Sequence, residues 1–174
     1  MSKKSVVVII PYFNESESIL TTLRSIDQQT FKPNNVMLVD SGSTDASFDL
    51  VKEWILDNKK HNFQNIFSGE MSPSSSINNA IHKSSEEIIA YVDCGLDIPS
   101  NWLETSLNEM EMNSADMVSL KIYTTGVNSI DKSFIAQTYG YKMNRICLPG
   151  SLIKRKVFSK TGLFIEKVRA SYDI

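Results

Sequence analysis

The sequence predicts an α/β fold with a mostly parallel sheet and helices on both of its faces. Short apolar runs rich in β-branched residues alternate with segments whose apolar residues recur at helical spacing. The runs at 5–10, 36–39 and 87–93 are nearly continuous, which is typical of strands covered on both faces. Alternating strands and helices form βαβ units with right-handed crossovers, so their strands are parallel.

The first half of the chain shows three strand-and-helix pairs. The first strand ends at Pro11, and Ile19, Leu23 and Ile26 then form one apolar helical face. The second strand ends on a polar segment that leads into a helix, and a polar loop containing Pro73 follows the third. We expect strands at 5–10, 36–39 and 63–67, and helices beginning near 19, 45 and 77.

The second half is less regular. Its first strand, at 87–93, stops abruptly at a carboxylate and a glycine, and Pro99 opens a helix. We expect further strands at 116–122 and at 146–153, the latter interrupted by Pro149-Gly150. A short helix through Val157 should end near Gly162. Residues 123–145 break any clean period and are predicted as loop with some helix.

Composition bounds the class of protein. The chain has 174 residues, 41% of them hydrophobic, and a net charge of -2, as expected for a single domain at 1–174. With 18 basic and 20 acidic residues there is no basic excess for a nucleic-acid partner. The two cysteines have no metal or disulfide spacing, so we interpret them as buried or half-buried thiols in a reducing compartment. No transmembrane segment is predicted, so we expect a cytoplasmic protein, with any membrane association peripheral.

Two acids end predicted buried strands. Asp40 follows 36–39 and Asp93 closes 87–93, while residues 11–15 follow the first strand. Because parallel strands end on the same side of the sheet, these residues should gather along one edge. Ligands of open α/β sheets bind at that edge, so both acids are better placed for binding than for stability.

The chemistry of this edge suggests a nucleotide ligand without a glycine-rich phosphate loop. Carboxylates accept hydrogen bonds from a base or from ribose hydroxyls, and they hold divalent cations that in turn hold a diphosphate. Phe13 or Tyr12 would stack on a base. Two structural alternatives stay open, because Asn14 could simply cap the first helix and Asp45 the second.

Four motifs, at 8–15, 39–45, 78–93 and 149–164, occur in an order that resembles the GT-A glycosyltransferases of family 2, which are inverting and use nucleotide sugars. Residues 8–15 are similar to the family's opening strand and P-x-Y-N-E turn, and residues 39–45 to its V-D-D-G-S-T-D segment. Asn78 lies fifteen positions before Asp93, as in the family's helix before the D-x-D motif. Residues 149–151 and 157–164 resemble its later glycine turn and V-G-G-F stretch.

The resemblance implies roles for single residues. Asp40 would recognise the base, with Pro11 and Phe13 shaping its pocket, and Asp93 would contact ribose or a metal. The implied cofactor is a divalent cation, Mn²⁺ or Mg²⁺. The full set expected to bind the nucleotide sugar is Pro11, Tyr12, Phe13, Asn14, Glu15, Asp40, Asn78 and Asp93.

The chain departs from the family pattern in two places. Gly95 stands where the D-x-D motif has its second acid, so Asp97 is the substitute metal ligand or else a turn residue. Without metal, the diphosphate would need cations such as Arg145, Lys154 or Arg155. The catalytic base implied by the family is Asp173, next to the end of the chain, which indicates a domain truncated at its C-terminus.

We therefore expect a glycosyltransferase domain that takes a nucleotide sugar, with a UDP-sugar as the favoured donor. It would transfer the sugar with inversion to a glycan, a lipid-linked sugar or a protein, as in polysaccharide biosynthesis. One alternative is a non-catalytic remnant that binds nucleotide sugars. A second is an interaction module that keeps the fold as a scaffold.

Overall fold

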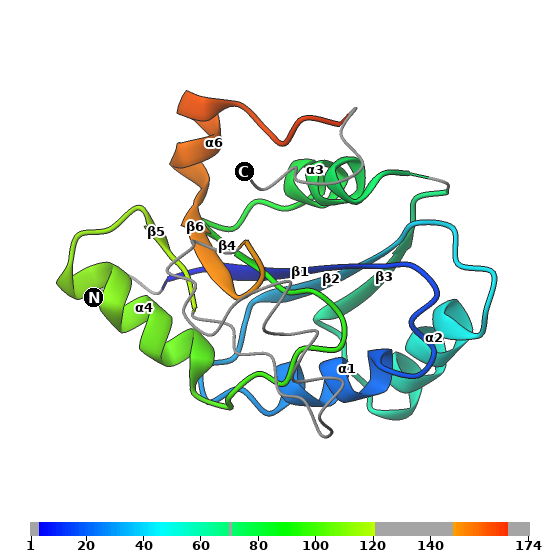
Figure 1. Ribbon diagram of the computed structural model, residues 1–174. Helices are drawn as coiled ribbons and strands as arrows, with labels where there is room; N and C mark the ends of the chain where they lie inside the picture. Colours follow the sequence, from blue (N-terminus) through cyan, green and yellow to red (C-terminus); the bar gives the residue numbers. More distant parts are fainter. Residues whose placement is uncertain (1–3, 70, 121–147, 167–174) are drawn as a thin grey trace, which may run out of the picture.

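A computed structural model describes residues 4–69, 71–120 and 148–166 (Figure 1). The strands form one six-stranded sheet in the order β3-β2-β1-β4-β6-β5. The strand bounds are β1 Val6–Tyr12, β2 Asn35–Asp40, β3 Phe63–Phe67, β4 Ile88–Tyr91, β5 Met117–Val118 and β6 Ser151–Lys154. The helix bounds are α1 Ile19–Asp27, α2 Ser47–Asp57, α3 Pro73–Lys83, α4 Trp102–Met112 and α6 Arg155–Thr161.

Strands β1 to β4 are parallel, and β1 lies in the centre between β2 and β4. Tyr12 is level with Asp40, and Ile9 is level with Tyr91. Asp93 follows β4 by two residues and therefore lies beside the end of β1. The predicted gathering of Asp40 and Asp93 at one edge of the sheet is confirmed.

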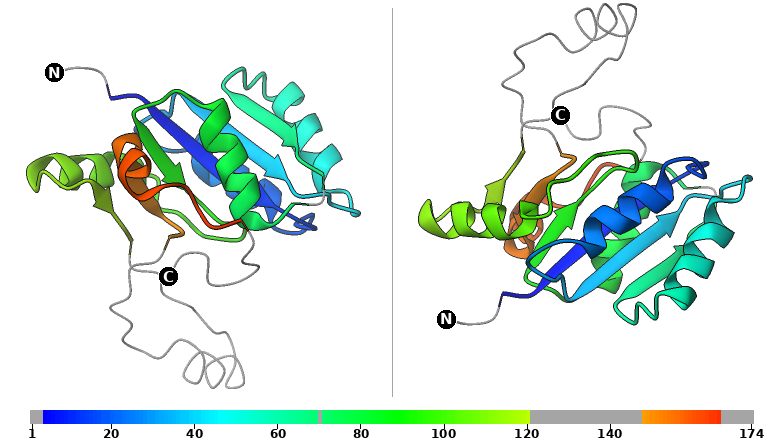
Figure 2. Two further views of the ribbon diagram at one scale, coloured as in Figure 1. Left: turned by 90° about the horizontal axis from the view of Figure 1, so that it is seen from above. Right: turned by 90° about the horizontal axis from the view of Figure 1, so that it is seen from below.

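Helices cover both faces of the sheet, as predicted (Figures 1 and 2). Helices α1, α2 and α4 pack below it in Figure 1, against Val6, Val8 and Ile10 of β1. Helices α3 and α6 pack above it, against Val7 and Ile9. Every residue of 6–10 is fully buried, because both faces of the central strand are covered.

The last strands differ from the simplest expectation. Strand β6 begins only at Ser151, after the turn at Pro149-Gly150, and runs antiparallel to β4 and β5. The indole nitrogen of Trp102 donates to the Gly150 carbonyl at 3.1 Å and ties α4 to this turn. The antiparallel direction brings Lys154 level with Ile88, at the beginning of β4.

Several element bounds also differ from the sequence prediction. Helix α3 begins four residues earlier than expected, at Pro73, because Ser72 caps it by accepting a hydrogen bond from Ser75 N. Strand β5 is only two residues long. Residues 123–145 lie outside the described residues. No helix in the described part of the chain has the length and apolarity needed to cross a bilayer.

Candidate functional site

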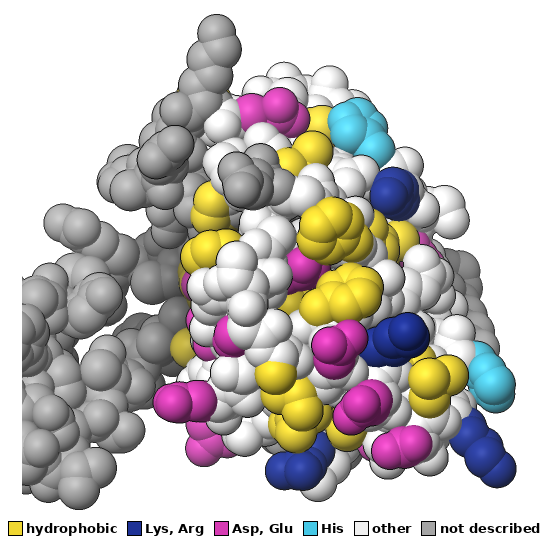
Figure 3. Space-filling model, turned by 90° about the vertical axis from the view of Figure 1, so that its right-hand side faces the viewer, with side chains coloured by type: hydrophobic (Ala, Val, Ile, Leu, Met, Phe, Trp, Pro, Cys, Tyr) yellow, Lys and Arg dark blue, Asp and Glu magenta, His cyan; other side chains and the backbone are white. Residues whose placement is uncertain are grey.

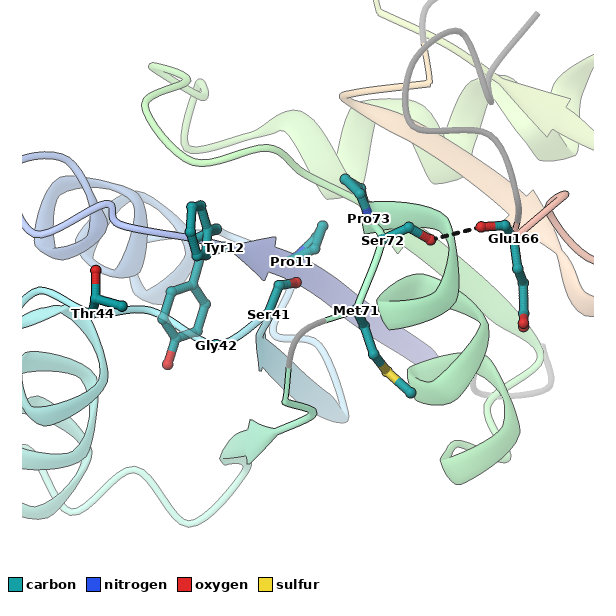
Figure 4. Close-up of a pocket in the computed structure, with 10 residues that line it drawn as sticks. Pro11, Tyr12, Ser41, Gly42, Thr44, Met71, Ser72, Pro73 and Glu166 are labelled. Atoms are coloured by element: carbon teal, nitrogen blue, oxygen red, sulfur yellow. Dashed lines mark hydrogen bonds between the residues drawn. The ribbon is translucent and has the colours of Figure 1, made fainter.

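A cavity of about 660 Å³ opens at the carboxyl edge of the parallel strands (Figure 4). Its walls come from the end of β1 and the loop after it, the loop after β2, the start of α3 with the residues before it, and the segment after α6. The lining residues are Pro11, Tyr12, Phe13, Ser41, Gly42, Thr44, Met71, Ser72, Pro73 and Glu166. Sequence reasoning placed the first two walls at one edge, because the segments that carry them follow neighbouring parallel strands, and the family resemblance includes both segments.

Neighbouring aromatic residues on the first wall have different roles. Tyr12 is only 3% exposed, and its hydroxyl donates to Asn65 Oδ1 at 2.7 Å. Burial, with the nearby charge of Asp40, raises the pKa of the Tyr12 hydroxyl well above its usual value. The side chain of Phe13 is 55% exposed at the cavity. Of the two stacking candidates, Phe13 presents the accessible ring.

Asp40 lies beneath the second wall rather than on it. Its side chain is fully buried, and its two oxygens accept the Ser43 amide hydrogen at 3.1 and 3.3 Å. The next residues, Ser41 and Gly42, form the surface of the cavity. Gly42 has a φ of +91°, a conformation that glycine adopts without strain. The Asp40 carboxylate thus shapes the loop that a base would meet.

Asn14 joins the two loops instead of capping α1. Its Oδ1 accepts hydrogen bonds from the amides of Thr44 at 2.8 Å and Asp45 at 3.3 Å. Asn14 has a φ of +55°, which asparagine tolerates better than most residues. The N-cap position of α1 is occupied by Ser18, so the capping alternative for Asn14 is wrong.

Asp45 and Glu15 complete this connection between the loops. Asp45 accepts the amide hydrogens of Ser47 at 2.9 Å and Ser16 at 3.1 Å. Hydrogen bonds from Ser47 and Ser16 lower the pKa of Asp45 to about 2. The N-cap position of α2 is occupied by Ala46, so the capping alternative for Asp45 is also wrong. Its carboxylate instead connects Ser47, the first residue of α2, to the loop after β1. The Glu15 amide donates to Ser47 Oγ at 2.7 Å.

Asp93 lies at the predicted edge and is half-buried. Its Oδ1 accepts a hydrogen bond from the Tyr91 hydroxyl. The thiol of half-buried Cys94 has a pKa raised to about 12 by burial and by the charges of Glu15 and Asp93. Asp97 is exposed. Among residues 4–69, 71–120 and 148–166, no three His, Cys, Asp or Glu side chains are close enough together to hold a metal ion.

Asn78 is buried behind the cavity and does not line it. Its Oδ1 accepts from Phe164 N at 3.1 Å, and its Nδ2 donates to Phe164 O at 2.9 Å. Nδ2 also donates to Glu166 Oε1 at 3.1 Å. The side chain thus fastens residues 164–166 to α3.

Two of the candidate diphosphate cations lie away from the cavity. Lys154 pairs with Asp116 at 3.2 Å at the opposite edge of the sheet, since β6 is antiparallel. Arg155 donates to the carbonyl of Ile81, in the last turn of α3, at 2.9 Å, and to the carbonyl of Glu86, after that helix, at 2.6 Å. The suggestion that they neutralise a diphosphate in this cavity is wrong. Arg145 and the predicted base Asp173 lie outside the described residues.

The surface around the cavity combines apolar and acidic groups. Figure 3 faces the carboxyl edge and shows hydrophobic side chains near its middle, with Asp and Glu side chains beside them. Exposed apolar residues in and next to the loops of this edge include Phe13, Phe67 and Met71. Phe67 packs edge-on against Phe48, with ring centroids 6.0 Å apart.

Glu166 and Met71 were not identified from the sequence as site residues. They line the cavity together with Ser72 (Figure 4). Ser72 immediately before Pro73 is a recognisable helix-start signal and would have located the third wall. Glu166 carries no comparable local signal, because tertiary packing brings it to the cavity.

The family model for glycosyl transferase family 2 matches residues 7–162. The match covers β1 to β6, with both loops of the cavity. The chain therefore belongs to glycosyl transferase family 2 and carries its GT-A fold.

Curated relatives include a cholesterol galactosyltransferase of Borreliella burgdorferi, 29% identical over 136 residues, which are 76% of this chain and 37% of the relative. Glycosyltransferase AglE of Haloferax volcanii is 27% identical over 165 residues, covering 93% of this chain and 52% of the relative. The chain thus spans about half, or less, of the length of these relatives.

Solved structures show the same fold. Residues 1–349 of S. aureus TarS, in complex with UDP, have a TM-score of 0.76 at 19% identity, and the match covers 97% of this chain and 52% of that TarS fragment. The mannosyltransferase PcManGT of Pyrobaculum calidifontis, in complex with GDP-Man and Mn²⁺, has a TM-score of 0.76 at 20% identity. That match covers 96% of this chain and 49% of PcManGT.

Proposed function

We propose that this protein is a glycosyltransferase that binds a nucleotide sugar in the cavity at the carboxyl edge of β1 and β2. The proposal depends mainly on one observation, the cavity built from the two loops that follow these strands. Phe13 offers an accessible ring to a base, and the Asp40 carboxylate shapes the opposite loop. Family membership and the UDP and GDP-Man complexes of proteins with the same fold support it.

The proposed reaction is transfer of the sugar with inversion to a hydroxyl of a glycan, a lipid-linked sugar or a protein. Such a transfer needs a base for the acceptor proton and stabilisation of the departing nucleoside diphosphate. Asp173 is the proposed base on the family resemblance. We further propose that the protein acts in the cytoplasm, at the membrane face if its acceptor is lipid-linked.

The acids at the carboxyl edge of the sheet show how far this chain could hold the implied divalent cation, Mn²⁺ or Mg²⁺. Asp93 is half-buried beside the end of β1 and is the proposed ligand. Asp97 is exposed, and Gly95 offers no side-chain ligand, so the side chains of the described residues alone do not form a complete metal site. We therefore assign no step of the reaction to the metal.

The experiment is a transfer assay with the intact protein and radiolabelled UDP-GlcNAc or GDP-mannose, with and without Mn²⁺. Release of UDP or GDP with formation of a labelled product supports the proposal, and Asp93→Ala should abolish it. Calorimetry with UDP and GDP runs in parallel. Saturable nucleotide heat without any turnover would instead favour a non-catalytic remnant, for which Gly95 is the specific observation. Absence of both nucleotide heat and turnover would favour the interaction module.

A further inference from the structure

Glu166 is the single charged side chain among the residues that line the described cavity. One of its oxygens, Oε1, accepts from Asn78 Nδ2 at 3.1 Å. Within residues 4–69, 71–120 and 148–166, its other oxygen makes no hydrogen bond. An ionised carboxylate only accepts hydrogen bonds, so this oxygen has capacity for a donor from a ligand.

The segment that carries Glu166 is fixed on both sides. Asn78 is 3% exposed and pairs with both backbone polar groups of Phe164, at 3.1 and 2.9 Å. The Ser72 hydroxyl donates to the Glu166 carbonyl at 3.0 Å (Figure 4). The ring of Phe164 packs against Phe158 of α6, with centroids 5.7 Å apart. Asn78 is buried and the two phenylalanines are half-buried, so these contacts fix the backbone of 164–166. Glu166 itself is exposed, and Asn78 Nδ2 holds its carboxylate at the cavity wall.

The charge of Glu166 restricts what can lie beside it. A diphosphate would be repelled by a carboxylate at close range, whereas sugar hydroxyls are hydrogen-bond donors that a carboxylate accepts strongly. The walls formed by Phe13 and by the loop after Asp40 carry no charge at the cavity. They present an aromatic ring and an uncharged surface to a ligand. A nucleotide sugar in this cavity would therefore place a hydroxyl-bearing ring near Glu166.

We propose that Glu166 is a donor-binding residue that accepts hydrogen bonds from hydroxyls of the nucleotide sugar, and that Asn78 is the positioning residue that holds it. This inference rests on the proposed function and identifies one residue, Glu166, by which the protein would recognise the nucleotide sugar. It also gives Asn78 a different role from direct donor contact, because its side chain atoms are occupied by Phe164 and Glu166.

The test measures binding of UDP and UDP-GlcNAc to the intact protein by calorimetry. Glu166→Gln preserves the acceptor for Asn78 Nδ2 and removes only the charge, so the fold and Tm should be unchanged. We expect affinity to fall about 10- to 100-fold, as for loss of a hydrogen bond to a charged group. An equal loss for both probes would assign the contact to the ribose, and a loss for UDP-GlcNAc alone would assign it to the transferred sugar.

Asn78→Asp tests the positioning role. It introduces a carboxylate against Phe164 O and the Glu166 carboxylate, so we expect weaker binding than in wild type. Adding Glu166→Gln to Asn78→Asp should not weaken binding further and should raise Tm, because the repulsion is relieved. Asn79→Ala is the matched control, since Asn79 lies on the same helix but donates to Ser68 at 3.0 Å, outside the cavity.

Two results would overturn the inference, and they are distinguishable. Wild-type affinity for both probes in Glu166→Gln, with normal binding by the wild-type protein, would reject the role of Glu166 and leave the proposed function standing. No binding of either probe by the wild-type protein would remove the proposed function and this inference together.

Discussion

At the residue scale, two acids shape the cavity, one at the end of β2 and one in the loop that follows it. Asp40 holds the loop after β2 through Ser43, and Asp45 connects that loop to the loop after β1 through Ser16. Asn14 supports the same connection from the other side. Residues that line the cavity and residues that shape its loops thus alternate within a few positions. A sequence motif therefore locates the binding region more reliably than it assigns a role to each residue.

Acid titration should show the contribution of Asp45. Its pKa in the folded protein, about 2, lies below its ordinary value of 3.8, because Ser47 and Ser16 donate hydrogen bonds to the ionised form. The stabilisation is therefore fully present above pH ~4 and is lost as pH falls toward 2. Carboxyl NMR should show Asp45 titrating near pH 2. In Asp45→Asn the pH dependence of Tm between 4 and 2 should be weaker, and an unchanged dependence would contradict this.

Phe13→Ala should weaken nucleotide binding without changing stability. The ring is 55% exposed, so little packing is lost, whereas stacking on a base is worth about 1–3 kcal/mol. We expect UDP or GDP affinity, measured by calorimetry, to fall about 5- to 100-fold. Phe67→Ala is the control, since Phe67 is equally accessible at 63% but does not line the cavity. Similar losses in both variants would show that Phe13 does not contact the base.

At the element scale, α3 connects the sheet to the cavity. Its first turn provides Ser72 and Pro73 to the wall, its middle holds Asn78 against Phe164, and Ile77 and Ile81 pack on the sheet. Because the apolar face of α3 packs on the sheet, this packing also fixes where Ser72 and Asn78 lie.

Removing the cap of α3 should lower stability measurably. Ser72 accepts the Ser75 amide hydrogen at 3.2 Å, so Ser72→Ala should cost about 1 kcal/mol in urea unfolding. Ser72→Thr retains a hydroxyl and should recover most of that free energy. If Ser72→Ala unfolds at the urea concentration of the wild-type protein, the cap does not contribute as described.

At the scale of the whole molecule, both apolar clusters depend on the central strand. Ile10 belongs to the cluster under α1 and α4, and Ile9 to the cluster under α3 and α6. Both side chains are fully buried. The two layers should therefore unfold together, because neither keeps its core without β1.

Truncation of either side chain should destabilise the entire chain. Ile9→Ala and Ile10→Ala should each lower the free energy of unfolding by about 2–5 kcal/mol, and Ile9→Val by about 0.5–1.5 kcal/mol. Urea unfolding followed by circular dichroism and tryptophan fluorescence should give one coincident transition. Separate transitions for the two probes, with Trp54 and Trp102 both on the α1 side, would contradict a shared core.

The sequence by itself determined the parallel strands β1 to β4, the helices between them, and the edge where Asp40 and Asp93 meet. These features follow from local hydrophobic periodicity and from the rule that parallel strands end together. The bounds of α3 were missed, although the signal at Ser72 and Pro73 is local.

Only the tertiary structure decided which other side chains join Pro11, Tyr12 and Phe13 in the cavity. The direction of β6 carried Lys154 and Arg155 to the opposite edge, and no local pattern shows whether a strand returns antiparallel. Glu166 reaches the wall because Asn78 binds Phe164 across 86 residues of sequence. Such positions arise from hydrogen bonds between distant segments, which a periodicity in neighbouring residues does not encode.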